Sequence, residues 1–230
     1  TLLFKDVLSY QTEEVFAVKG ILFLAILFLF MMLRGEAKAQ ENRISLPEFQ
    51  RKGGISVEEA IFQRRSIRSF RDEALTLREL SQLLFAAQGI TDEEYGFRAA
   101  PSAGALYPLT LYAVVGKVEG LAPGVYRYHP EKHELTGVKE GDQRTALFRV
   151  ALQQNSVKEA PVILIFTVIY ERTTRKYGER GIRYVHMEIG HAAQNVYLQA
   201  ESLGLGTVAI GAFLDGGVAE VLGLPKNEAP

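Results

Sequence analysis

The fold is organised around residues 183–213, which read RYVHMEIGHAAQNVYLQAESLGLGTVAIGAF. The first part of this stretch predicts a long helix, because apolar residues recur three and four positions apart along one face. These residues are Val185, Ile189, Ala192, Ala193, Val196, Ala200 and Leu203. Gly204 and Gly206 then predict the end of the helix, since glycine accepts the left-handed conformation of a helix cap.

The last part of the same stretch predicts a short buried strand over residues 207–210, followed by open backbone. Gly211 and Ala212 carry almost no side chain, so a flat ligand could lie directly on the backbone at this point. A simpler interpretation, a core helix followed by a core strand with no ligand, explains the same residues.

The composition is that of a globular protein with a sizeable core. The chain has 230 residues, of which 47% are hydrophobic and 23% are charged, and this length suits one domain or one domain with an appendage. The formal net charge of -1 gives no general attraction to nucleic acid or to an acidic membrane surface. The sequence has no cysteine, which excludes a disulfide framework and a cysteine metal site, and its four histidines are scattered. No metal centre is predicted.

The N-terminal segment has the features of an export signal. Residues 20–33, GILFLAILFLFMML, form an apolar run shorter than the roughly 20 residues that cross a bilayer. A lysine precedes the run and a small-x-small site follows at residues 37–39, as in signal peptides. We expect residues 1–39 to be a signal peptide with an upstream extension, translation to start near Val18, and the mature, exported chain to begin near Gln40. A retained membrane anchor and an isolated core helix are the alternatives, and a cytoplasmic location follows if the signal is not used.

An arginine-rich motif follows a polar linker or extended arm over residues 40–55. Ser56 and Glu59 form a capping box for a helix predicted over residues 57–64. Residues 64–71, RRSIRSFR, then place four arginines in eight positions. A helix C-terminus accounts for one or two of them, whereas four favour a pocket for a phosphate and a second electron-rich group. Nucleic acid is less well supported, because no aromatic residues or wider basic surface accompany the arginines.

The remaining sequence, to residue 230, predicts the rest of one domain that begins at residue 56. Thr76 and Glu79 form a second capping box, for a helix that ends at Gly89. Further helices are predicted from Asp142 to about residue 154 and from Asp215 to Gly223, and strands over residues 109–116, 124–128, 134–138 and 161–170. The last of these is nearly continuously apolar, which is typical of a central strand.

Two connections could carry chemistry. Residues 101–108, PSAGALYP, form a small-residue turn between two prolines, which is a common loop and also a rigid place to expose backbone amides. Residues 171–183 are polar and arginine-rich, and form either a solvated connection or a mobile loop over a pocket. His129 and His133 lie in a turn between two strands, where an exposed hairpin tip is favoured over a metal site.

Four motifs, in this order and spacing, resemble those of the FMN-dependent nitroreductase superfamily: RRSIRSF, PSAGALYP, KYGERGIRY and GLGTVAIGAF. The resemblance covers residues 56 to about 225. More narrowly, it is similar to the SagB-type branch, whose best-known members are azoline dehydrogenases that form thiazoles and oxazoles in peptides. It implies an α+β fold with a central mixed sheet flanked by helices, and an intertwined homodimer. Two FMN molecules would lie in the dimer interface, so that residues of both subunits build each site.

The resemblance also assigns roles to individual residues of the first motif. Arg64, Ser66 and Arg68 match the family's first flavin motif, and Arg65 between them is included among the cofactor-binding residues. Arg64 and Ser66 would hold the phosphate end, and Arg68 would lie near N1 and O2 of the flavin ring, where a cation stabilises the reduced flavin. The family usually adds a basic residue in a C-terminal strand, for which no match occurs before Pro230.

The next motif would serve the partner subunit. Pro101, Ser102 and Ala103, with Gly104 beside them, match the loop that reaches the flavin of the other subunit in this family.

The last two motifs would lie near the reacting atoms. Ile210, Gly211 and Ala212 match the segment whose backbone amide faces N5 of the flavin, the atom that accepts hydride. Lys176 and Tyr177 match a Lys-Tyr pair that serves in proton removal from the substrate of azoline dehydrogenases.

The resemblance therefore implies an oxidoreductase that takes a hydride at flavin N5 and passes electrons to a second substrate in a ping-pong cycle. Dehydrogenation of a heterocycle or peptide competes with reduction of nitroaromatics or quinones by NAD(P)H. No Gly-x-Gly-x-x-Gly fingerprint is present, so a separate dinucleotide domain is not implied. A non-catalytic flavin-binding protein and an envelope interaction module are the alternatives. Nucleic acid is not expected as a partner, and the membrane is expected to be contacted only through the N-terminal segment.

Overall fold

The computed structural model describes residues 43–230, so the expected signal peptide and the expected start near Gln40 lie outside the described residues. Asn42–Pro230 form one compact unit, which contains everything described below. Among residues 43–230, no helix combines the length and the apolar character needed to cross a bilayer.

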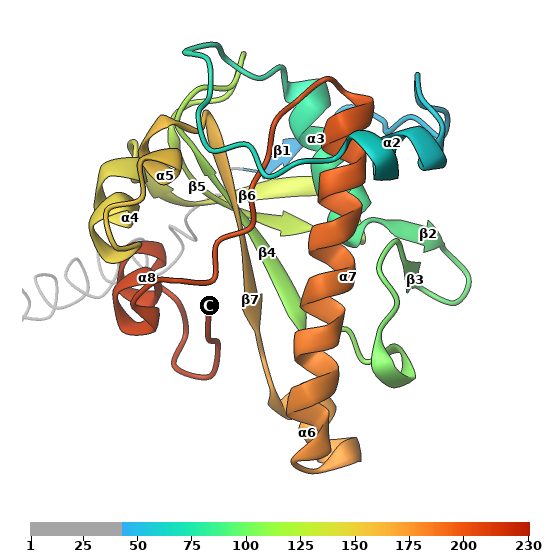
Figure 1. Ribbon diagram of the computed structural model, residues 1–230. Coiled ribbons are helices and arrows are strands. Elements are labelled where there is room, and N and C mark those ends of the chain that lie inside the picture. Colours follow the sequence, from blue (N-terminus) through green and yellow to red (C-terminus); the bar gives the residue numbers. More distant parts are fainter. Residues whose placement is uncertain (1–42) are drawn as a thin grey trace, which may run out of the picture. The chain divides into compact units, whose positions relative to one another are not determined.

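A five-stranded sheet forms the centre of this unit (Figure 1). Its strands lie in the order β1 (Arg43–Ser45), β6 (Glu134–Glu140), β5 (Gly124–His129), β4 (Leu109–Val115) and β7 (Val162–Val168). Neighbouring strands in this order run antiparallel, and isolated parallel bridges join Ser66 to Thr207 and Leu75 to Val118. Four of the five strands predicted from the sequence are confirmed, each within about two residues of its bounds.

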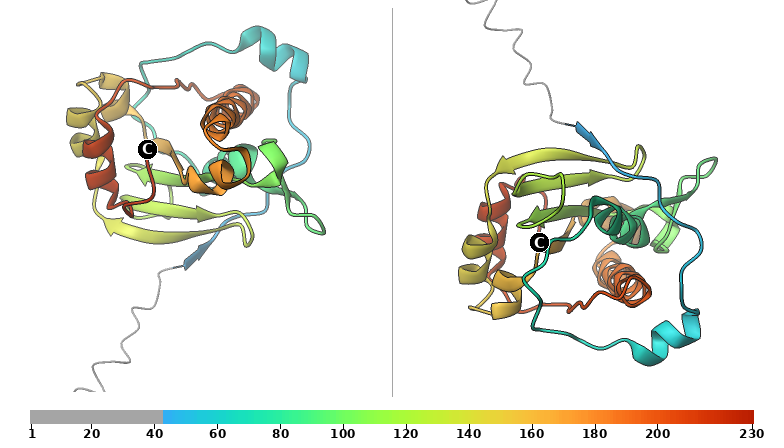
Figure 2. Two further views of the ribbon diagram at one scale, coloured as in Figure 1. Left: turned by 90° about the horizontal axis from the view of Figure 1, so that it is seen from below. Right: turned by 90° about the horizontal axis from the view of Figure 1, so that it is seen from above.

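Helices cover both faces of the sheet and form a core on each face (Figures 1 and 2). On one face, α3 (Leu77–Gln88) packs its leucines against alternate residues of β4. On the other face, α4 (Arg144–Val150), α5 (Asn155–Glu159) and α8 (Asp215–Leu222) pack against the intervening residues of that strand. The chain therefore has an α+β architecture, as expected. A small hairpin of β2 (Ile90–Asp92) and β3 (Phe97–Arg98) and the short helix η1 (Ala103–Ala105) lie outside the main sheet.

β7 lies at an edge of the sheet, so the interpretation of residues 161–170 as a central strand is wrong. Its apolar sequence has another cause, because each of its faces meets a core. Val162, Leu164 and Phe166 pack against one core, and Ile163 and Ile165 pack against the other.

The long helix predicted in the organising stretch is confirmed as α7 (Arg180–Ser202). Val185, Ala192 and Ala200 are buried along the predicted face. The helix ends as expected, because Gly204 has a φ of 70° and the Leu205 amide donates to the Ala200 carbonyl at 2.8 Å.

The strand predicted over residues 207–210 does not form. Only Thr207 makes a bridge, and its partner, Ser66, belongs to an irregular segment and not to a strand. Ala209, Gly211 and Ala212 are exposed. A single neighbour without regular structure cannot continue a ladder, so this segment remains open to solvent.

The polar segment 171–183, predicted as a connection or a mobile loop, is helical. It contains α6 (Glu171–Tyr177) and the start of α7. Its glutamate, arginine and lysine residues are good helix formers, and Gly178, with a φ of 58°, makes the sharp change of direction. A Cβ atom at Gly181 would lie 3.0 Å from the Thr174 backbone, so glycine allows the two helices to pack closely.

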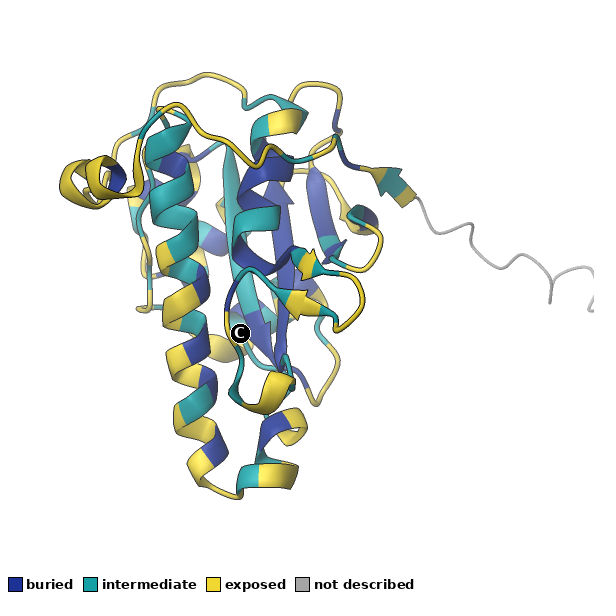
Figure 3. Cartoon of the chain, turned by 90° about the vertical axis from the view of Figure 1, so that its right-hand side faces the viewer, coloured by how far each residue is buried: buried dark blue, intermediate teal, exposed yellow. Residues whose placement is uncertain are grey.

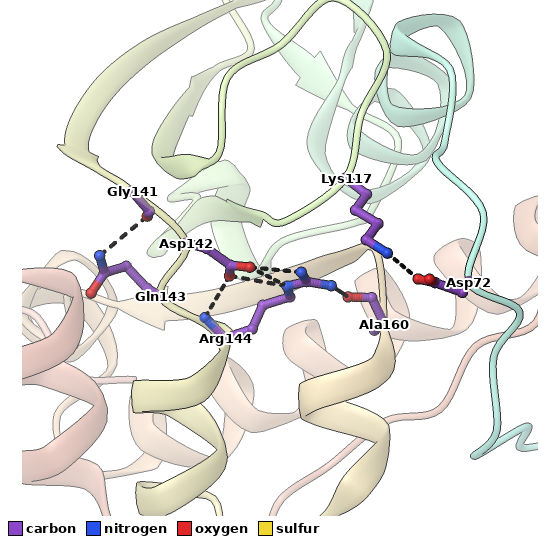
Figure 4. Close-up of polar contacts among 7 residues, drawn as sticks. All are labelled: Asp72, Lys117, Gly141, Asp142, Gln143, Arg144 and Ala160. Atoms are coloured by element: carbon purple, nitrogen blue, oxygen red, sulfur yellow. Dashed lines mark hydrogen bonds and ion pairs between the residues drawn. The ribbon is translucent and has the colours of Figure 1, made fainter.

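The single helix predicted from Asp142 to residue 154 is divided into α4 and α5. Leu152 and Gln153 have positive φ values of 55° and 57°, which break the helix. Asp142 accepts from the Arg144 amide at 3.0 Å and also pairs with the Arg144 guanidinium at 2.6 Å. Arg144 in turn donates to the Ala160 carbonyl at 3.1 Å, so one arginine joins the start of α4 to the end of α5 (Figure 4).

Residues 43–55 pack along the unit as an extended segment. The rings of Phe49 and Phe85 stack with centroids 3.5 Å apart. His133 lies beside them and is half-buried, with hydrogen bonds to the Tyr128 hydroxyl at 2.8 Å and the Ser81 hydroxyl at 2.7 Å. The expectation of an exposed tip is therefore wrong for both histidines. The N-terminal segment covers His133, and His129 is the half-buried last residue of β5 and lies outside the turn.

Candidate functional site

The first and the last sequence motifs lie side by side. Besides the bridge between Ser66 and Thr207, the Ile67 amide donates to the Thr207 carbonyl at 3.0 Å. A Cβ atom at Gly206 would lie 2.9 Å from an Ile67 side-chain carbon, so glycine is required for this close approach. The fold thus joins the arginine-rich motif to the open backbone beyond α7.

Tyr197 of α7 connects the two motifs, and sequence reasoning missed it. Its hydroxyl lies 3.1 Å from Ser66 Oγ and accepts from the Ala209 amide at 2.8 Å. The Arg64 guanidinium lies 5.1 Å from the centre of its ring, within range of a cation–π interaction. The sequence did contain a signal for this role. Tyr197 lies one turn after Ala193 on the predicted buried face, and a half-buried tyrosine usually directs its hydroxyl to a polar partner.

The arginines of the first motif have different surroundings. Arg65 donates from Nη1 to the Phe62 carbonyl at 2.9 Å and the Arg64 carbonyl at 2.8 Å, and so closes the end of α2 (Val57–Gln63). Arg68 is exposed, and the single side-chain hydrogen bond that it makes within residues 43–230, to the Ser66 carbonyl, is long at 3.4 Å. Arg64 and Arg68 therefore remain available to a negatively charged ligand.

The backbone beyond α7 is open where the sequence predicted it. A Cβ atom added at Gly211 would meet no heavy atom within 4 Å. The Ala212 carbonyl is held by Gln154 Nε2 at 2.9 Å. Cations and a hydroxyl group beside a flat, uncovered backbone segment are the donors that a flavin mononucleotide requires, so these residues fit that cofactor.

Lys176 and Tyr177 meet the loop that contains Gly104. Gly104 has a φ of 65°, and a Cβ atom there would lie 2.7 Å from Tyr177 Oη and 2.9 Å from Lys176 Nζ. Ser102 Oγ accepts from the Tyr107 amide at 2.9 Å, which holds the turn. Two motifs that are far apart in sequence therefore form a second cluster.

Glu188 is a buried carboxyl group beside this second cluster, and it too was missed. Its residue is 2% exposed, and its Oε1 atom has no hydrogen-bond partner among residues 43–230. Burial raises the pKa of Glu188 from 4.5 to about 7, against the opposing effects of a hydrogen bond with Ser102 and the charge of Arg98. The available signal was a glutamate at helical spacing between Val185 and Ala192, on the apolar face of α7.

The two clusters lie at different levels of α7. Tyr197 contacts the first cluster, and Glu188 lies beside the second. The two residues are nine positions apart on the helix, which corresponds to about 14 Å along its axis. The fold thus brings the predicted site residues together in two groups. The first cluster contains Arg64, Ser66, Arg68 and residues 210–212. Residues 101–104, Lys176 and Tyr177 form the other.

Comparison with known proteins defines the class. Residues 61–230 match the Nitroreductase family. The protein MJ1384 of Methanocaldococcus jannaschii, provisionally named a nitroreductase, is 51% identical over 179 residues, which cover 78% of this chain and 88% of that protein.

Solved structures agree with this match. A Ralstonia eutropha structure, also provisionally named a nitroreductase, aligns with a TM-score of 0.73 and 30% identity over 84% of this chain and 88% of its own. A chain of the Escherichia coli microcin synthetase McbBCD complex, solved with truncated pro-MccB17 bound, aligns with a TM-score of 0.63 and 28% identity over 86% of this chain and 77% of its own.

The fold and the matched residues define an oxidoreductase. The chain belongs to the nitroreductase family. The predicted α+β nitroreductase-like fold and the prediction of an oxidoreductase from this flavin-dependent family are thereby confirmed.

Proposed function

We propose that this chain binds FMN and works as a homodimeric oxidoreductase in a ping-pong cycle, taking a hydride from one substrate and passing two electrons to another. The observation that carries the proposal is the contact between the first and the last motifs through Ser66, Tyr197 and Thr207. The family resemblance assigns the phosphate and the ring of the flavin to these two motifs. Their joint placement supports one cofactor site.

The residues of the chain would divide the work of binding. Arg64 and Ser66 would hold the phosphate, and Arg68 would supply a positive charge at the N1 and O2 end of the ring. The backbone of residues 210–212 would lie along the ring. When bound, FMN supplies the hydride-accepting chemistry, while the protein supplies position, charge and an uncovered surface.

Exposed apolar side chains support the proposed dimer. In α2, Val57, Ile61 and Phe62 are 64%, 58% and 79% exposed, and only Ala60 is buried (Figure 3). On α7, Ile182 and Met187 are 42% and 54% exposed. The separation of the two clusters within one chain fits the same proposal, because residues 101–104 would then complete the flavin site of the partner subunit.

The test is an absorption spectrum of the purified protein with FMN, followed by anaerobic titration with NADH and NADPH. Arg68→Ala should weaken FMN binding or lower the flavin's reduction potential. One charge-assisted contact of about 1.5–3 kcal/mol corresponds to a tenfold to hundredfold loss of affinity. The matched control is Arg78→Ala, at an exposed arginine of α3 outside the 64–71 motif. Unchanged affinity together with unchanged potential in Arg68→Ala would contradict the assignment.

The same spectra separate the other classes of function. A yellow protein whose flavin neither NAD(P)H nor dithionite reduces would be a flavin-binding protein without catalysis. A colourless, folded protein that takes up no FMN would be an interaction module.

A second candidate function is the oxidation of a heterocycle or peptide, as in the SagB-type branch. The contact of Lys176 and Tyr177 with Gly104 favours it, because a helix and not a mobile loop holds the pair in place. The structural likeness to a chain of the microcin synthetase complex, which was solved with a peptide bound, supports the same branch. Here Lys176 and Tyr177 would take a proton from the substrate.

Lys176→Ala tests this candidate. With an azoline-containing peptide, the rate of flavin reduction should fall about 10²–10⁴-fold, the usual contribution of a general base. Reoxidation by an acceptor that needs no base should be nearly unchanged, and Arg175→Ala on the same helix is the control. Equal reduction rates for Lys176→Ala and the parent would remove the pair from the mechanism.

We also propose export through residues 1–39. Mass spectrometry of the protein from its natural host would test this, because cleavage should leave an N-terminus near Gln40. An uncleaved N-terminal segment in that protein would contradict it.

A further inference from the structure

A polar cavity of about 90 Å³ lies where two strands of the main sheet separate. The ladder between β4 and β5 ends at the pair Tyr112 and Arg127. Both strands continue beyond this pair, β4 to Leu109 beside β7 and β5 to His129 beside β6. Leu109 to Leu111 and Tyr128 to His129 line the cavity, so it fills the gap between the diverging strands.

The cavity carries an excess of positive charge. Its walls include three arginines, Arg98, Arg127 and Arg172, and one carboxylate, Glu131. Arg98 pairs with Glu131 at 3.0 Å, which leaves two arginines unmatched by any carboxylate in the walls. The buried carboxyl group of Glu228 does not line the cavity and accepts a hydrogen bond from Thr167.

Three buried nitrogen atoms, each in a residue that lines the cavity, have no hydrogen-bond partner among residues 43–230. They are Gln88 Nε2, Arg98 Nε and His129 Nε2. Gln88 is only 1% exposed, and its amide oxygen already accepts from Arg98 Nη1 at 3.0 Å. Gln88 Nε2 and Arg98 Nε are donors in every state, and His129 Nε2 is a donor in one of its two neutral tautomers. Since buried donors without an acceptor are strongly disfavoured, this arrangement favours a ligand that accepts hydrogen bonds.

We propose that this cavity binds a small oxyanion of the carboxylate or phosphate type. Water would satisfy the free donors, whereas an oxyanion would satisfy them and also pair with Arg127 and Arg172, which have no carboxylate partner in the walls. The size agrees, since the cavity has room for several water molecules but not for a nucleotide. None of the residues assigned to FMN lines it, so the proposal stands apart from the proposed function.

The bound anion would also stabilise the loop of the second cluster. Tyr107 in that loop accepts from the Arg98 amide at 3.3 Å through its hydroxyl and from Arg172 Nη1 at 3.2 Å through its carbonyl. The Arg98 guanidinium also lies 4.7 Å from the centre of the Tyr107 ring. An anion that binds Arg98 and Arg172 would therefore also hold Tyr107 in place, because both arginines contact it.

The experiment measures binding of sodium phosphate and of sodium acetate by calorimetry and by thermal unfolding, at constant ionic strength set with chloride. The protein is first saturated with FMN, so that the proposed flavin site is not free for phosphate. Arg127→Gln is the variant of choice, because the Arg127 guanidinium forms no hydrogen bond with another residue among 43–230 and only its backbone is paired in the sheet. Arg149→Gln, an exposed arginine of α4 away from the cavity, is the matched control.

At least one of the two anions should bind and raise the unfolding temperature of the parent and of Arg149→Gln. Arg127→Gln should weaken this binding at least tenfold while its FMN affinity stays unchanged, and Arg172→Gln should weaken it as well. Binding of phosphate alone or of acetate alone identifies the class of anion. No effect of either anion beyond that of chloride, or equal binding by Arg127→Gln and the parent, would overturn the proposal.

Discussion

Glu188 occupies a position on α7 where the other residues of the same face are apolar. A carboxyl group with a raised pKa in the folded state holds its proton more tightly there than in the unfolded chain. Its contribution to folding is therefore fully present below about pH 4.5 and is lost as the pH rises toward about 7. The Ser102 side chain opposes the rise in this pKa, which links the charge state of Glu188 to the loop of the second cluster.

Glu188→Gln should remove this pH dependence. The free energy of unfolding of the variant should exceed that of the parent increasingly from pH 4.5 to pH 7, and the difference at the upper end should be roughly 1–3 kcal/mol. Chemical denaturation at several pH values measures it. Glu179→Gln, an exposed glutamate just before α7, is the control. A constant difference between variant and parent over this range would contradict the assigned role.

Tyr197 acts through a single hydroxyl group. Tyr197→Phe removes its contacts with Ser66 and the Ala209 amide, and should lower the free energy of unfolding by about 0.5–1.5 kcal/mol. FMN affinity should fall by up to about tenfold, since both motifs lose their common partner. Tyr95→Phe, at a tyrosine that is 65% exposed, is the control for denaturation and for flavin titration. Two variants with equal FMN affinity would show that the hydroxyl does not organise the site.

At the scale of elements, the turn around Gly104 is held in place by α6. Gly104 and Gly96 both have left-handed backbone angles, with φ values of 65° and 67°. They differ in their surroundings, because a Cβ atom would meet Lys176 and Tyr177 at Gly104 but no heavy atom within 4 Å at Gly96. This pair separates the effect of backbone strain from the effect of contact with the Lys-Tyr pair.

Gly104→Ala and Gly96→Ala should each lower the free energy of unfolding by about 1–2 kcal/mol, the cost of left-handed alanine. The stabilities should be similar, because the ends of the Lys176 and Tyr177 side chains can move away. Only Gly104→Ala should slow flavin reduction by a substrate that must lose a proton, since it displaces both groups. Equal reduction rates in the two variants would place the pair outside the reaction.

At the scale of the whole molecule, α2 stands out because it buries one residue and exposes three large apolar ones (Figure 3). Phe62→Lys should weaken or abolish the proposed dimer and lower FMN occupancy with it, because a charge would enter an apolar interface. Tyr95→Lys, at another exposed aromatic residue, is the control. Sedimentation velocity of the flavin-loaded protein measures both variants. A parent protein that sediments as a monomer with full flavin occupancy would contradict the dimer.

The sequence by itself determined those elements that depend on near neighbours. The capping box of Thr76 and Glu79 fixes the start of α3, and Gly204 fixes the end of α7. The strands followed from β-branched apolar runs and polar turns. Each of these signals acts within about one helical turn or along one strand, so a short stretch of sequence is enough to predict the element.

Only the tertiary structure decided how distant segments meet. The meeting of Ser66 with Thr207 and the covering of His133 both depend on packing between segments far apart in the chain. The cavity between β4 and β5 likewise forms because each strand follows its outer neighbour beyond Tyr112 and Arg127. Such a contact depends on the shape and charge of both contacting segments. A local stretch of sequence specifies only one of these segments, so the contact cannot be predicted from it alone.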